Sequence, residues 1–513
     1  MGGTWRTSGV GKPTPDAGPT GRAPDEGAAD EGAAAERPGV NAAQAAAEAL
    51  VHPTHDDPFV AGLSDAIGGP TGSRWAPHRW WAPVQVLLLL TALTFALGMT
   101  TKAACVGDGW QDEQVRYTHA CYSDLPYLYT WRGLQAGEWP YTDDDTVREA
   151  YDVMEYPVGI SYWAWATAKV TSWIDADDGE QAGVTYVAVN AVGFALVGLL
   201  TTWLLAGVHR RRPWDAAGWA LAPAVALTAL INWDLLAVAT VAGAAWAWAR
   251  GRPLLTGVLI GLGTAVKLYP GLLLGAVLVL CIRERRAAPM VRATLAAVLV
   301  WLLVNLPAML TGPHAWGHFW TFNSERGADL GSLWLVIQDA GGRTLSPEAV
   351  NEGSWIVLAL ACVGVLVIGL KAPSTPRFAQ LGFLVLAAFL IVNKVYSPQY
   401  VLWLLPLAVL ARPRWRDLMI WQAGEIVYFF VVWFHLAGLT ENASGRQAVY
   451  WVAILLRVAA QLWFVAVVVR DVLRPDADPV AEERGGLYGR PDEVESGDGR
   501  PAGPVRSEPA RTV

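Results

Sequence analysis

Long apolar segments separated by short polar loops run along most of this sequence, from about residue 80 to about residue 475. A transmembrane helix needs roughly 20 mostly apolar residues, and fewer suffice where one end meets a water-filled cavity. The pattern therefore predicts an all-α polytopic membrane protein with about 12 transmembrane helices. The predicted spans are residues 82–99, 183–207, 215–231, 235–249, 254–267, 270–282, 290–310, 354–370, 378–393, 399–411, 417–437 and 447–469.

The two ends of the chain have a different composition. Residues 1–75 are rich in Ala, Gly, Pro and acidic residues and contain few aromatics, and residues 476–513 are similar. Such segments bury too little apolar surface to offset the entropy lost on ordering. We therefore expect two disordered tails on either side of one transmembrane domain, residues 80–475.

Lys and Arg residues gather in every second loop of the apolar region. Because cytoplasmic loops carry an excess of these residues, the basic loops are predicted to face the cytoplasm. This arrangement predicts a multi-pass protein of the plasma membrane with both termini cytoplasmic. The basic loops are residues 209–213, 249–253, 283–286, 371–377, 412–416 and 470–475.

Residues 158–174 form an aromatic segment that conflicts with this alternation if it spans the membrane. Spanning would place the acidic loop 175–181 in the cytoplasm and the basic loop 209–213 outside, against the charge rule. We therefore predict an amphipathic helix at the external membrane surface, within one long external loop, residues 100–182. A further span with weak charge control remains the alternative.

The overall composition supports a membrane protein. The 513 residues are 53% hydrophobic and 16% charged, whereas soluble domains carry about 25% charged residues. The net charge of −8 says little, since most acids lie in the tails and a few loops. No basic stripe suited to phosphate contacts is visible, which argues against a nucleic-acid partner.

Four cysteines are present, and two of them, Cys105 and Cys121, fall in the predicted external loop. A disulfide persists in that compartment, so a bridge and two free thiols are both open. Cys281 and Cys362 lie in separate apolar spans and are expected to be packing residues. No pair of cysteines has the spacing typical of a zinc site.

Polar residues are concentrated on the predicted external side. Ionisable groups in or beside apolar spans are costly, so they indicate function by default. Their gathering on one face predicts an extracytoplasmic site at the outer membrane surface. These residues are Asp124, Arg132, Glu155, Asn232, Asp234, Lys267, Tyr269, His314, His318, Asn323, Arg326, Asp329, Lys394, Tyr396 and Gln399.

Asp124 stands among aromatic residues, just ahead of Pro126 and of a predicted short helix over residues 127–135. One interpretation is that its carboxylate caps this helix. The other is a general base whose pKa is set by burial and by neighbouring charges.

Lys267 and Lys394 each lie at the outer end of an apolar span. Two ammonium groups there suit a phosphate leaving group, on which charge develops. Snorkelling of each lysine to the headgroups is the simpler alternative. Asp234 lies in a tight turn, where it either caps the following helix or, with Asn232, binds sugar hydroxyls.

Glu425 and Arg457 lie at similar depths in adjacent antiparallel spans. Their depths differ by about 5 Å at the rise of 1.5 Å per residue. We therefore predict a structural ion pair within the membrane.

The polar positions recur in motifs with a definite order: CYSDLPYLYTWRGLQAGEWPY (121–141), EYPV (155–158), INWDLLAVA (231–239), GLGTAVKLYPGLLL (261–274), NSERG with GSLW (323–334) and NKVYSPQYVLWLLPL (393–407). With these motifs the chain resembles glycosyltransferase family 87 of the GT-C superfamily, over about residues 80–475.

The resemblance implies a hexosyltransferase, and the family's best-known activities favour an α-mannosyltransferase. The donor would be a polyprenyl-phosphate sugar and the acceptor a glycolipid or cell-envelope glycan, used with inversion at the outer leaflet. Asp124 maps to the catalytic base. The resemblance suggests no cofactor and no metal ion. The implied substrate-binding residues are Lys267, Lys394, Glu155, Arg132, Arg326, Tyr396 and Asp234.

Two other classes remain open from the sequence. A secondary transporter or lipid flippase would favour ionisable residues at the midplane and broken helices in two repeated halves, but no clear two-half repeat is visible. A non-catalytic assembly partner is the other. The sequence leaves the sugar, the acceptor and the oligomeric state undecided.

Overall fold

The computed structural model describes residues 50–68, 82–175, 180–440 and 447–481. Within these ranges every regular element is a helix and no β-strand occurs. Six helices are long and apolar enough to cross a membrane. They are α4 (Pro83–Thr100), α10 (Glu180–Ala206), α16 (Ala287–Thr311), α19 (Pro347–Lys371), α22 (Trp415–Leu436) and α23 (Ala448–Leu473).

Five shorter apolar helical segments occur where further spans were predicted. Three are single helices and two begin with a turn of 3₁₀-helix. Several of them are buried nearly all round, which explains why they are hydrophobic on every side. They are α13 (Leu235–Ala249), α14 (Pro253–Val266), η3 with α15 (Tyr269–Leu272 and Leu273–Arg283), α20 (Phe378–Val392) and η4 with α21 (Pro398–Tyr400 and Val401–Ala411).

The predicted span over residues 215–231 is wrong as a single helix. The segment is divided into η2 (Pro213–Ala216), α11 (Ala217–Ala220) and α12 (Pro223–Thr228). Pro223 pushes the preceding residue out of the helical region, and Ala222 is indeed extended. The apolar run in the sequence hid this break because its composition is uniform.

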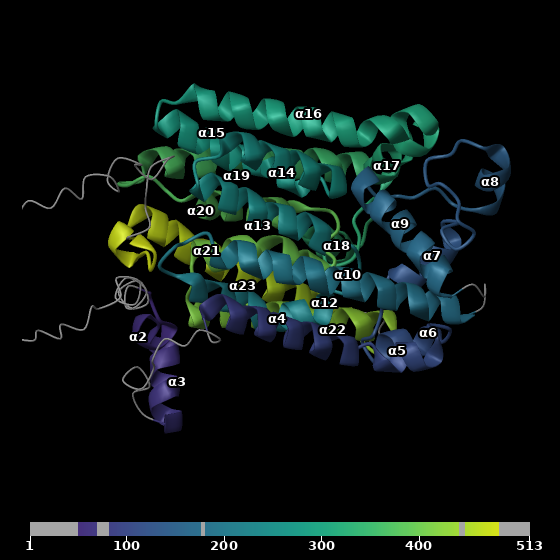
Figure 1. Ribbon diagram of the computed structural model, residues 1–513, viewed down its shortest axis with the longest axis horizontal. Helices are drawn as coiled ribbons and strands as arrows, with labels where there is room; N and C mark the ends of the chain where they lie inside the picture. The colour runs from purple at the N-terminus through teal and green to yellow at the C-terminus, as the bar shows by residue number, and fades with distance from the viewer. Residues whose placement is uncertain (1–49, 69–81, 176–179, 441–446, 482–513) are drawn as a thin grey trace, which may run out of the picture. The chain divides into compact units, whose positions relative to one another are not determined.

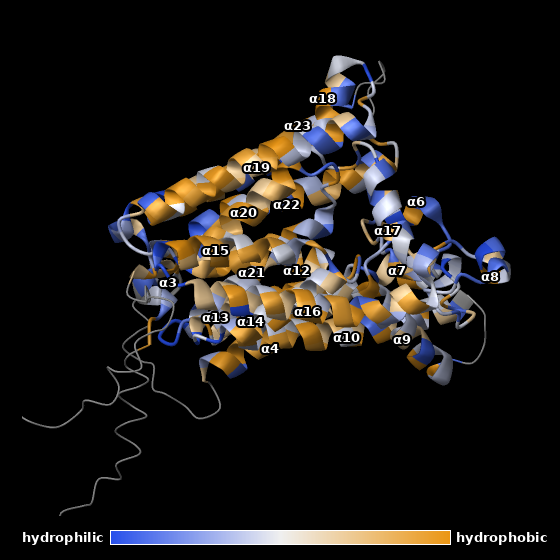
Figure 2. Cartoon of the chain, turned by 90° about the horizontal axis from the view of Figure 1, so that it is seen from above, coloured by the Kyte–Doolittle hydropathy of each residue, from blue (hydrophilic) through white to orange (hydrophobic). Residues whose placement is uncertain are grey.

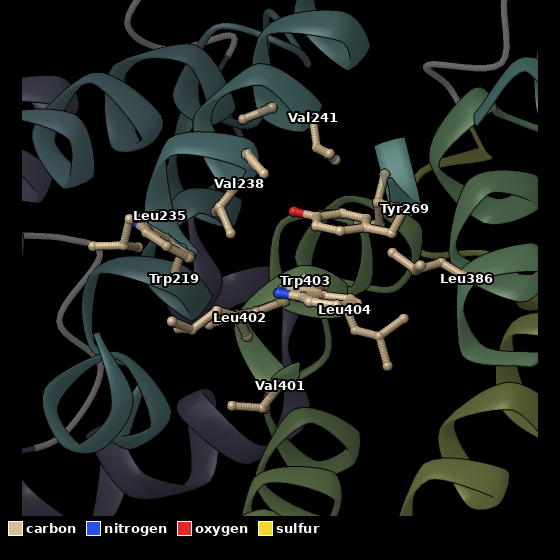
Figure 3. Packing of buried hydrophobic residues seen from close by; sticks show 14 of the residues in the cluster. Trp219, Leu235, Val238, Val241, Tyr269, Leu386, Val401, Leu402, Trp403 and Leu404 are labelled. Atoms are coloured by element: carbon tan, nitrogen blue, oxygen red, sulfur yellow. The ribbon is translucent and has the colours of Figure 1, made fainter. Parts of the chain in front are cut away.

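The interior is built where the short helices meet. Figure 3 shows Trp403 of α21 and Tyr269 of η3 stacked face to face among apolar side chains of α13, α20 and α21. Their ring centroids are 4.4 Å apart with an interplanar angle of 10°. This stack lies directly behind the polar turn that carries Asp234, because the Trp403 indole N–H donates to that carboxylate.

The polar segments lie at the two ends of the long helices. In Figure 1, the helices α5 (Ala103–Asp108), α6 (Glu113–Thr118), α7 (Leu125–Trp131) and α8 (Asp145–Ala150) gather at one end, and the loop between α15 and α16 lies at the other. Figure 2 shows apolar residues concentrated on the long helices and hydrophilic residues at both ends. The predicted helix over residues 127–135 is α7, which begins and ends earlier in the chain.

The segment predicted to lie on the external surface forms α9 (Val158–Ile174). It packs against the N-terminal half of α10, where the Trp163 indole donates to Asn190. Its C-terminal Trp173 is 81% exposed. The α9 helix is therefore present, while its position relative to a bilayer stays a prediction.

The end of the molecule that holds α5 to α8 also holds α17 (Pro313–Glu325) and α18 (Leu333–Gly341).

Cys105 and Cys121 form a disulfide, which settles the alternative left open by the sequence. Their Cα atoms are 5.8 Å apart, and the bridge joins α5 to the residue three positions before Asp124. Cys281 and Cys362 are free.

Two short stretches inside the predicted disordered tails are ordered. Within residues 1–75, α2 (Pro53–Asp56) and α3 (Pro58–Gly68) are helical, and the Asp56 carboxylate accepts from Arg212 at 2.7 Å and from Arg414 at 3.0 Å. After η5 (Pro475–Ala477), Asp478 is buried and paired with Arg377 at 2.8 Å. These ion pairs order short stretches whose composition alone indicates disorder. Residues 1–49, 69–81 and 482–513 lie outside the described residues.

Candidate functional site

The loop that carries Asp124 is held against the turn between α12 and α13. The Asp124 backbone N–H donates to the Ile231 carbonyl at 2.8 Å, and the Ser123 hydroxyl donates to the same oxygen at 3.4 Å. The disulfide fixes the chain just upstream at Cys121. Two segments more than 100 residues apart, CYSD and INWD, thus meet at Asp124.

The Asp124 carboxylate accepts one hydrogen bond on each oxygen. The Tyr122 hydroxyl donates to Oδ1 at 2.7 Å, and Asn232 Nδ2 donates to Oδ2 at 2.6 Å. Asp124 sits at the N-cap position of α7 with helical backbone angles and makes no side-chain capping bond. The capping interpretation is therefore wrong, because the carboxylate faces away from the helix end.

Burial raises the pKa of Asp124 above its usual range, while the two hydrogen bonds and the Lys267 ammonium oppose this rise. A carboxylate with a raised pKa is a stronger base than an exposed one, provided that it stays ionised. Its surroundings therefore fit proton abstraction better than a purely structural role.

Asn232 connects Asp124 to a second side chain. Its Nδ2 also donates to the Tyr156 hydroxyl at 2.8 Å, and its Oδ1 accepts from the Trp233 backbone N–H at 2.6 Å. The Trp233 indole in turn donates to Asn190 of α10 at 3.0 Å. The amide is thus fixed on both sides, and it orients the carboxylate.

Lys267 ends α14, where the backbone becomes extended before Pro270. Its Nζ lies 4.7 Å from the centroid of the Tyr156 ring, 5.8 Å from that of Trp403 and 5.9 Å from that of Tyr400. It also lies 3.4 Å from Asp234 Oδ1. Aromatic faces attract a cation, and the charge of Lys267 lowers the pKa of Asp124 against the effect of burial.

Asp234 does not cap α13, so the leading interpretation from the sequence is wrong. Its backbone is helical and its side chain makes no capping bond. The carboxylate turns instead toward Lys267 and accepts from the Trp403 indole at 2.7 Å. It is fully buried, and among the described residues its Oδ2 has no hydrogen-bond partner. This placement favours a role through Lys267 over direct substrate contact.

Arg326 lies in the loop after α17 and pairs with Asp329 at 2.5 Å. The loop is fastened to the strand-like segment after α20, where the Asp329 N–H donates to the Lys394 carbonyl at 2.8 Å. The charge of Arg326 acts on Tyr400 and Tyr156. The structure thus brings Arg326 toward the aromatic residues around Lys267.

Lys394 is used for fastening the same loop. Its Nζ donates to the Asn323 carbonyl at 2.5 Å and to Asn351 Oδ1 at 2.7 Å. Burial and the nearby Arg326 lower the pKa of Lys394. The Lys394 ammonium therefore joins α17 to α19. From the sequence, phosphate binding or snorkelling was predicted for this lysine.

Arg132 and Glu155 form an ion pair at 2.9 Å next to the site, and Arg132 also pairs with Asp152 at 2.9 Å. Glu155 precedes Tyr156, and its charge is felt at Asp124. The pair therefore borders the candidate site and fixes the segment that carries Tyr156.

Tyr396 lies away from Asp124, in the buried ionic cluster between α22 and α23. Its hydroxyl donates to Gln461 at 2.6 Å, and the Arg457 guanidinium stands 3.4 Å from its ring centroid. The predicted Glu425–Arg457 ion pair is confirmed at 2.6 Å. The structure thus groups Tyr396 with this pair, although the sequence suggested it for the substrate site.

Tyr156 also borders a small aromatic pocket on the side toward α16 and α17. The Trp316 indole donates to Asn305 at 2.9 Å, which fixes the position of α17 there. Leu268, next to Lys267, is 40% exposed at its edge. The lining residues are Tyr141, Tyr156, Pro157, Val158, Leu268, Trp301, Asn305, Trp316, Phe319 and Trp320.

The acidic run at residues 143–145 is used structurally. Asp143 accepts from the backbone N–H groups of His314 and Ala315, at 3.1 and 2.9 Å, and Asp144 caps α8. Across the part of the chain that the structure describes, no three His, Cys, Asp or Glu side chains are placed to hold a metal ion. Independence from metal ions stays a prediction.

Sequence reasoning missed three contributors: Tyr122, Tyr156 and Lys102, whose Nζ donates to the Tyr122 carbonyl at 2.8 Å. Tyr122 and Tyr156 stood inside quoted motifs, and each lies beside an acid, but aromatic residues are common at membrane interfaces. Lys102 stands directly after the first span, where a lysine normally snorkels. None of them carries a sequence signal of its own.

Comparison with known proteins adds a family. No curated protein sequence matches the chain. The model of glycosyltransferase family 87 matches residues 158–393, a region that includes Asp234, Lys267 and Arg326 and begins after Asp124. Residues 158–393 are therefore similar to glycosyltransferase family 87, and this similarity favours a membrane glycosyltransferase.

Proposed function

We propose that the protein transfers a sugar from a polyprenyl-phosphate donor to a hydroxyl group of a glycolipid or cell-envelope glycan, at the external face of the plasma membrane. Mannose is the sugar that the family resemblance favours, with inversion at the anomeric carbon. The proposal rests above all on one observation. Asn232 donates to both the Asp124 carboxylate and the Tyr156 hydroxyl, and the Lys267 ammonium lies 4.7 Å from the centroid of the Tyr156 ring, so the acid and the lysine belong to one cluster.

Asp124 is the general base of this reaction. It takes the proton of the acceptor hydroxyl while that oxygen attacks the anomeric carbon. The bond between the anomeric carbon and the phosphate oxygen breaks, and polyprenyl phosphate leaves as an anion. The bonds from Tyr122 and Asn232 hold the carboxylate in one orientation, which favours a productive approach.

Lys267 stabilises the negative charge that develops on the leaving phosphate, and Arg326 assists it from the neighbouring loop. Asp234 and the aromatic rings hold Lys267 in place before the donor binds. A group that is already oriented loses no reorganisation energy in the transition state.

The other residues suggested by the sequence support this centre. Lys394 fastens the loop that carries Arg326, and the Arg132–Glu155 pair fixes the segment of Tyr156. The Tyr396 backbone N–H donates to the Leu330 carbonyl at 2.9 Å, in the loop that carries Arg326, and its ring packs against Arg457. We assign no direct substrate contact to these four residues.

The test is sugar transfer by the full-length protein in nanodiscs, with radiolabelled polyprenyl-phosphomannose and a membrane-lipid extract as acceptor. Asp124→Asn is expected to lower kcat by about 10²- to 10⁴-fold, the usual contribution of a general base. Asp145→Asn, an exposed acid in the same external segment, is the matched control and should leave turnover unchanged.

Full turnover by a folded Asp124→Asn variant would contradict the role of Asp124. Donor binding without transfer by either protein would point to another acceptor. Proton-coupled uptake of a solute by reconstituted protein, without any transfer, would favour the transporter class instead.

A further inference from the structure

Lys102 is a fully buried lysine behind the candidate site. It follows α4 directly, its side chain has no exposed surface, and its Nζ donates to the Tyr122 carbonyl at 2.8 Å. It forms no ion pair with any residue that the structure describes. A buried ammonium is costly unless it is compensated, so a lysine at this position needs a reason.

Lys102 is connected to Asp124 through Tyr122, which contacts both residues. The residue that receives its hydrogen bond, Tyr122, donates its own hydroxyl to the Asp124 carboxylate. Cys105, three residues after Lys102, is bridged to Cys121, the residue before Tyr122. The disulfide and the lysine therefore hold the same short segment, and the attraction between Lys102 and Asp124 opposes the cost of burying the lysine.

The two lysines near Asp124 differ in what they face. Lys267 is paired with Asp234 and, in the proposed reaction, meets the donor phosphate. An anion bound to Lys267 cancels most of its field at Asp124. Lys102 faces the interior and no anionic partner other than Asp124 acts on it, so donor binding leaves its charge unchanged.

We propose that Lys102 is a positioning residue whose ammonium keeps Asp124 ionised, and therefore able to accept a proton, while the donor phosphate neutralises Lys267. This inference rests on the proposed function of Asp124 as the general base. It assigns a second purpose to the disulfide, which holds the segment between the lysine and the base.

The groups facing Asp124 are the two tyrosines Tyr122 and Tyr156 with Asn232, Lys267 and Glu155, and the charge of Asp124 also acts on Tyr400 and Lys102. Burial raises the pKa of both tyrosines well above the ordinary value, so they stay neutral donors. Burial lowers the pKa of Lys102 to about 7. Its charge is therefore present below that pH and is lost above it, and it supports Asp124 on the acidic side, where the carboxylate would otherwise take up a proton.

The test measures kcat against pH at saturating donor, with the full-length protein in nanodiscs. Lys102→Met and Lys102→Gln both remove the charge, and Gln retains a donor for the Tyr122 carbonyl. Each is expected to move the acidic limb of the profile to higher pH by about one unit or more, the usual effect of one nearby charge. The KM for donor should change less than twofold, because Lys102 is fully buried and its ammonium contacts the Tyr122 carbonyl.

Two further variants separate charge from structure. Cys105→Ser with Cys121→Ser loosens the same segment but keeps the ammonium, so it should lower the Tm and leave the acidic limb in place. Lys102→Arg keeps the charge, so its acidic limb should lie no higher than that of the unmodified protein.

An unmoved limb in a folded neutral variant would overturn the inference. If neither neutral variant folds, an upward shift in Lys102→Arg would overturn it as well. Full turnover by Asp124→Asn would instead disprove the proposed base, whatever the Lys102 variants show, so the two failures are distinguishable.

Discussion

At the scale of single residues, the role of each side chain in the candidate site depends more on its hydrogen-bond and ion-pair partners than on its residue type. Asp124 and Asp234 are both acids at a helix start, which favours capping in any sequence. In the structure neither caps, because each has a stronger partner across the fold: Asn232 for Asp124, and Lys267 for Asp234. Such partners lie far away in the sequence, and no local pattern reveals them.

The placement of Asp234 leads to a test of its role. Asp234→Asn keeps an oxygen for the Trp403 indole but removes the charge that balances Lys267, whose side chain is 9% exposed. An unbalanced buried cation is strongly destabilising, so the free energy of unfolding should fall by about 3 kcal/mol. Thermal unfolding in detergent measures this as a lower Tm.

A matched control for Asp234 is Asp339, which accepts from the Trp451 indole at 3.3 Å and has no lysine partner. Asp339→Asn should leave the Tm nearly unchanged. A raised KM for donor with an unchanged Tm in Asp234→Asn would show instead that Asp234 contacts the substrate directly.

At the scale of helices, apolar runs in the sequence located the elements well and their internal breaks poorly. The long helices and the five shorter ones appear where hydropathy predicted them. The segment 215–231 broke at Ala222 because a single proline outweighs a uniform apolar composition. Residues 53–68 became helical although their composition resembles a disordered tail, since Asp56 finds two arginines on the domain.

Close helix packing in the membrane depends on small residues, and α14 shows this against α16. A Cβ atom at Gly261 would lie 2.3 Å from the Ala297 carbonyl oxygen, and one at Gly257 would lie 2.1 Å from that of Ala293. Gly261→Val is therefore expected to force the helices apart. It should reduce the free energy of unfolding by about 3 kcal/mol, the upper part of the usual range for overpacking.

The same substitution at Gly275 of α15 is the control, because no atom lies within 4 Å of a Cβ there. Gly275→Val should change the free energy of unfolding by well under about 1 kcal/mol, because Val has a slightly higher helix propensity than Gly and meets no neighbouring atom there. Equal Tm values for the two variants would show that α14 and α16 are not held by this contact. Since α14 ends at Lys267, Gly261→Val should also lower turnover.

At the scale of the whole molecule, the sequence predicted an all-helical fold and the Glu425–Arg457 pair, and both are confirmed. It predicted Asp124 and Lys267 as members of one site, and in the structure Asn232 joins Asp124 to Tyr156, whose ring lies beside Lys267. It could not separate them from Tyr396, which joins a different cluster. A linear pattern gives depth along a helix but not rotation about it, and rotation decides which polar residues meet.

At this scale, labelling can test which face of the membrane each end of the molecule occupies. If α9 spans the membrane, every later loop changes sides. Single cysteines placed on a Cys281→Ser, Cys362→Ser background can be labelled in intact cells with a membrane-impermeant maleimide. Exposed positions suited to this are Asp145 before α9, Ser172 near its C-terminal end and Ala288 beside the basic loop. If α9 lies on the external surface, Asp145→Cys and Ser172→Cys both react from outside, and Ala288→Cys reacts only after the membrane is opened.

If α9 spans the membrane instead, Ser172→Cys becomes accessible only from the cytoplasm, while Asp145→Cys still reacts from outside. The position of α9 beside the N-terminal half of α10 favours the first outcome, because α4 packs on the other half of α10, where Thr91 and Thr202 are 2.7 Å apart. The α9 helix, which lies beside the N-terminal half of α10, therefore extends away from the helix bundle rather than through it. The basic loops then face the cytoplasm, as their charge requires, and Asp124 lies on the side where a polyprenyl-phosphate donor is proposed to act.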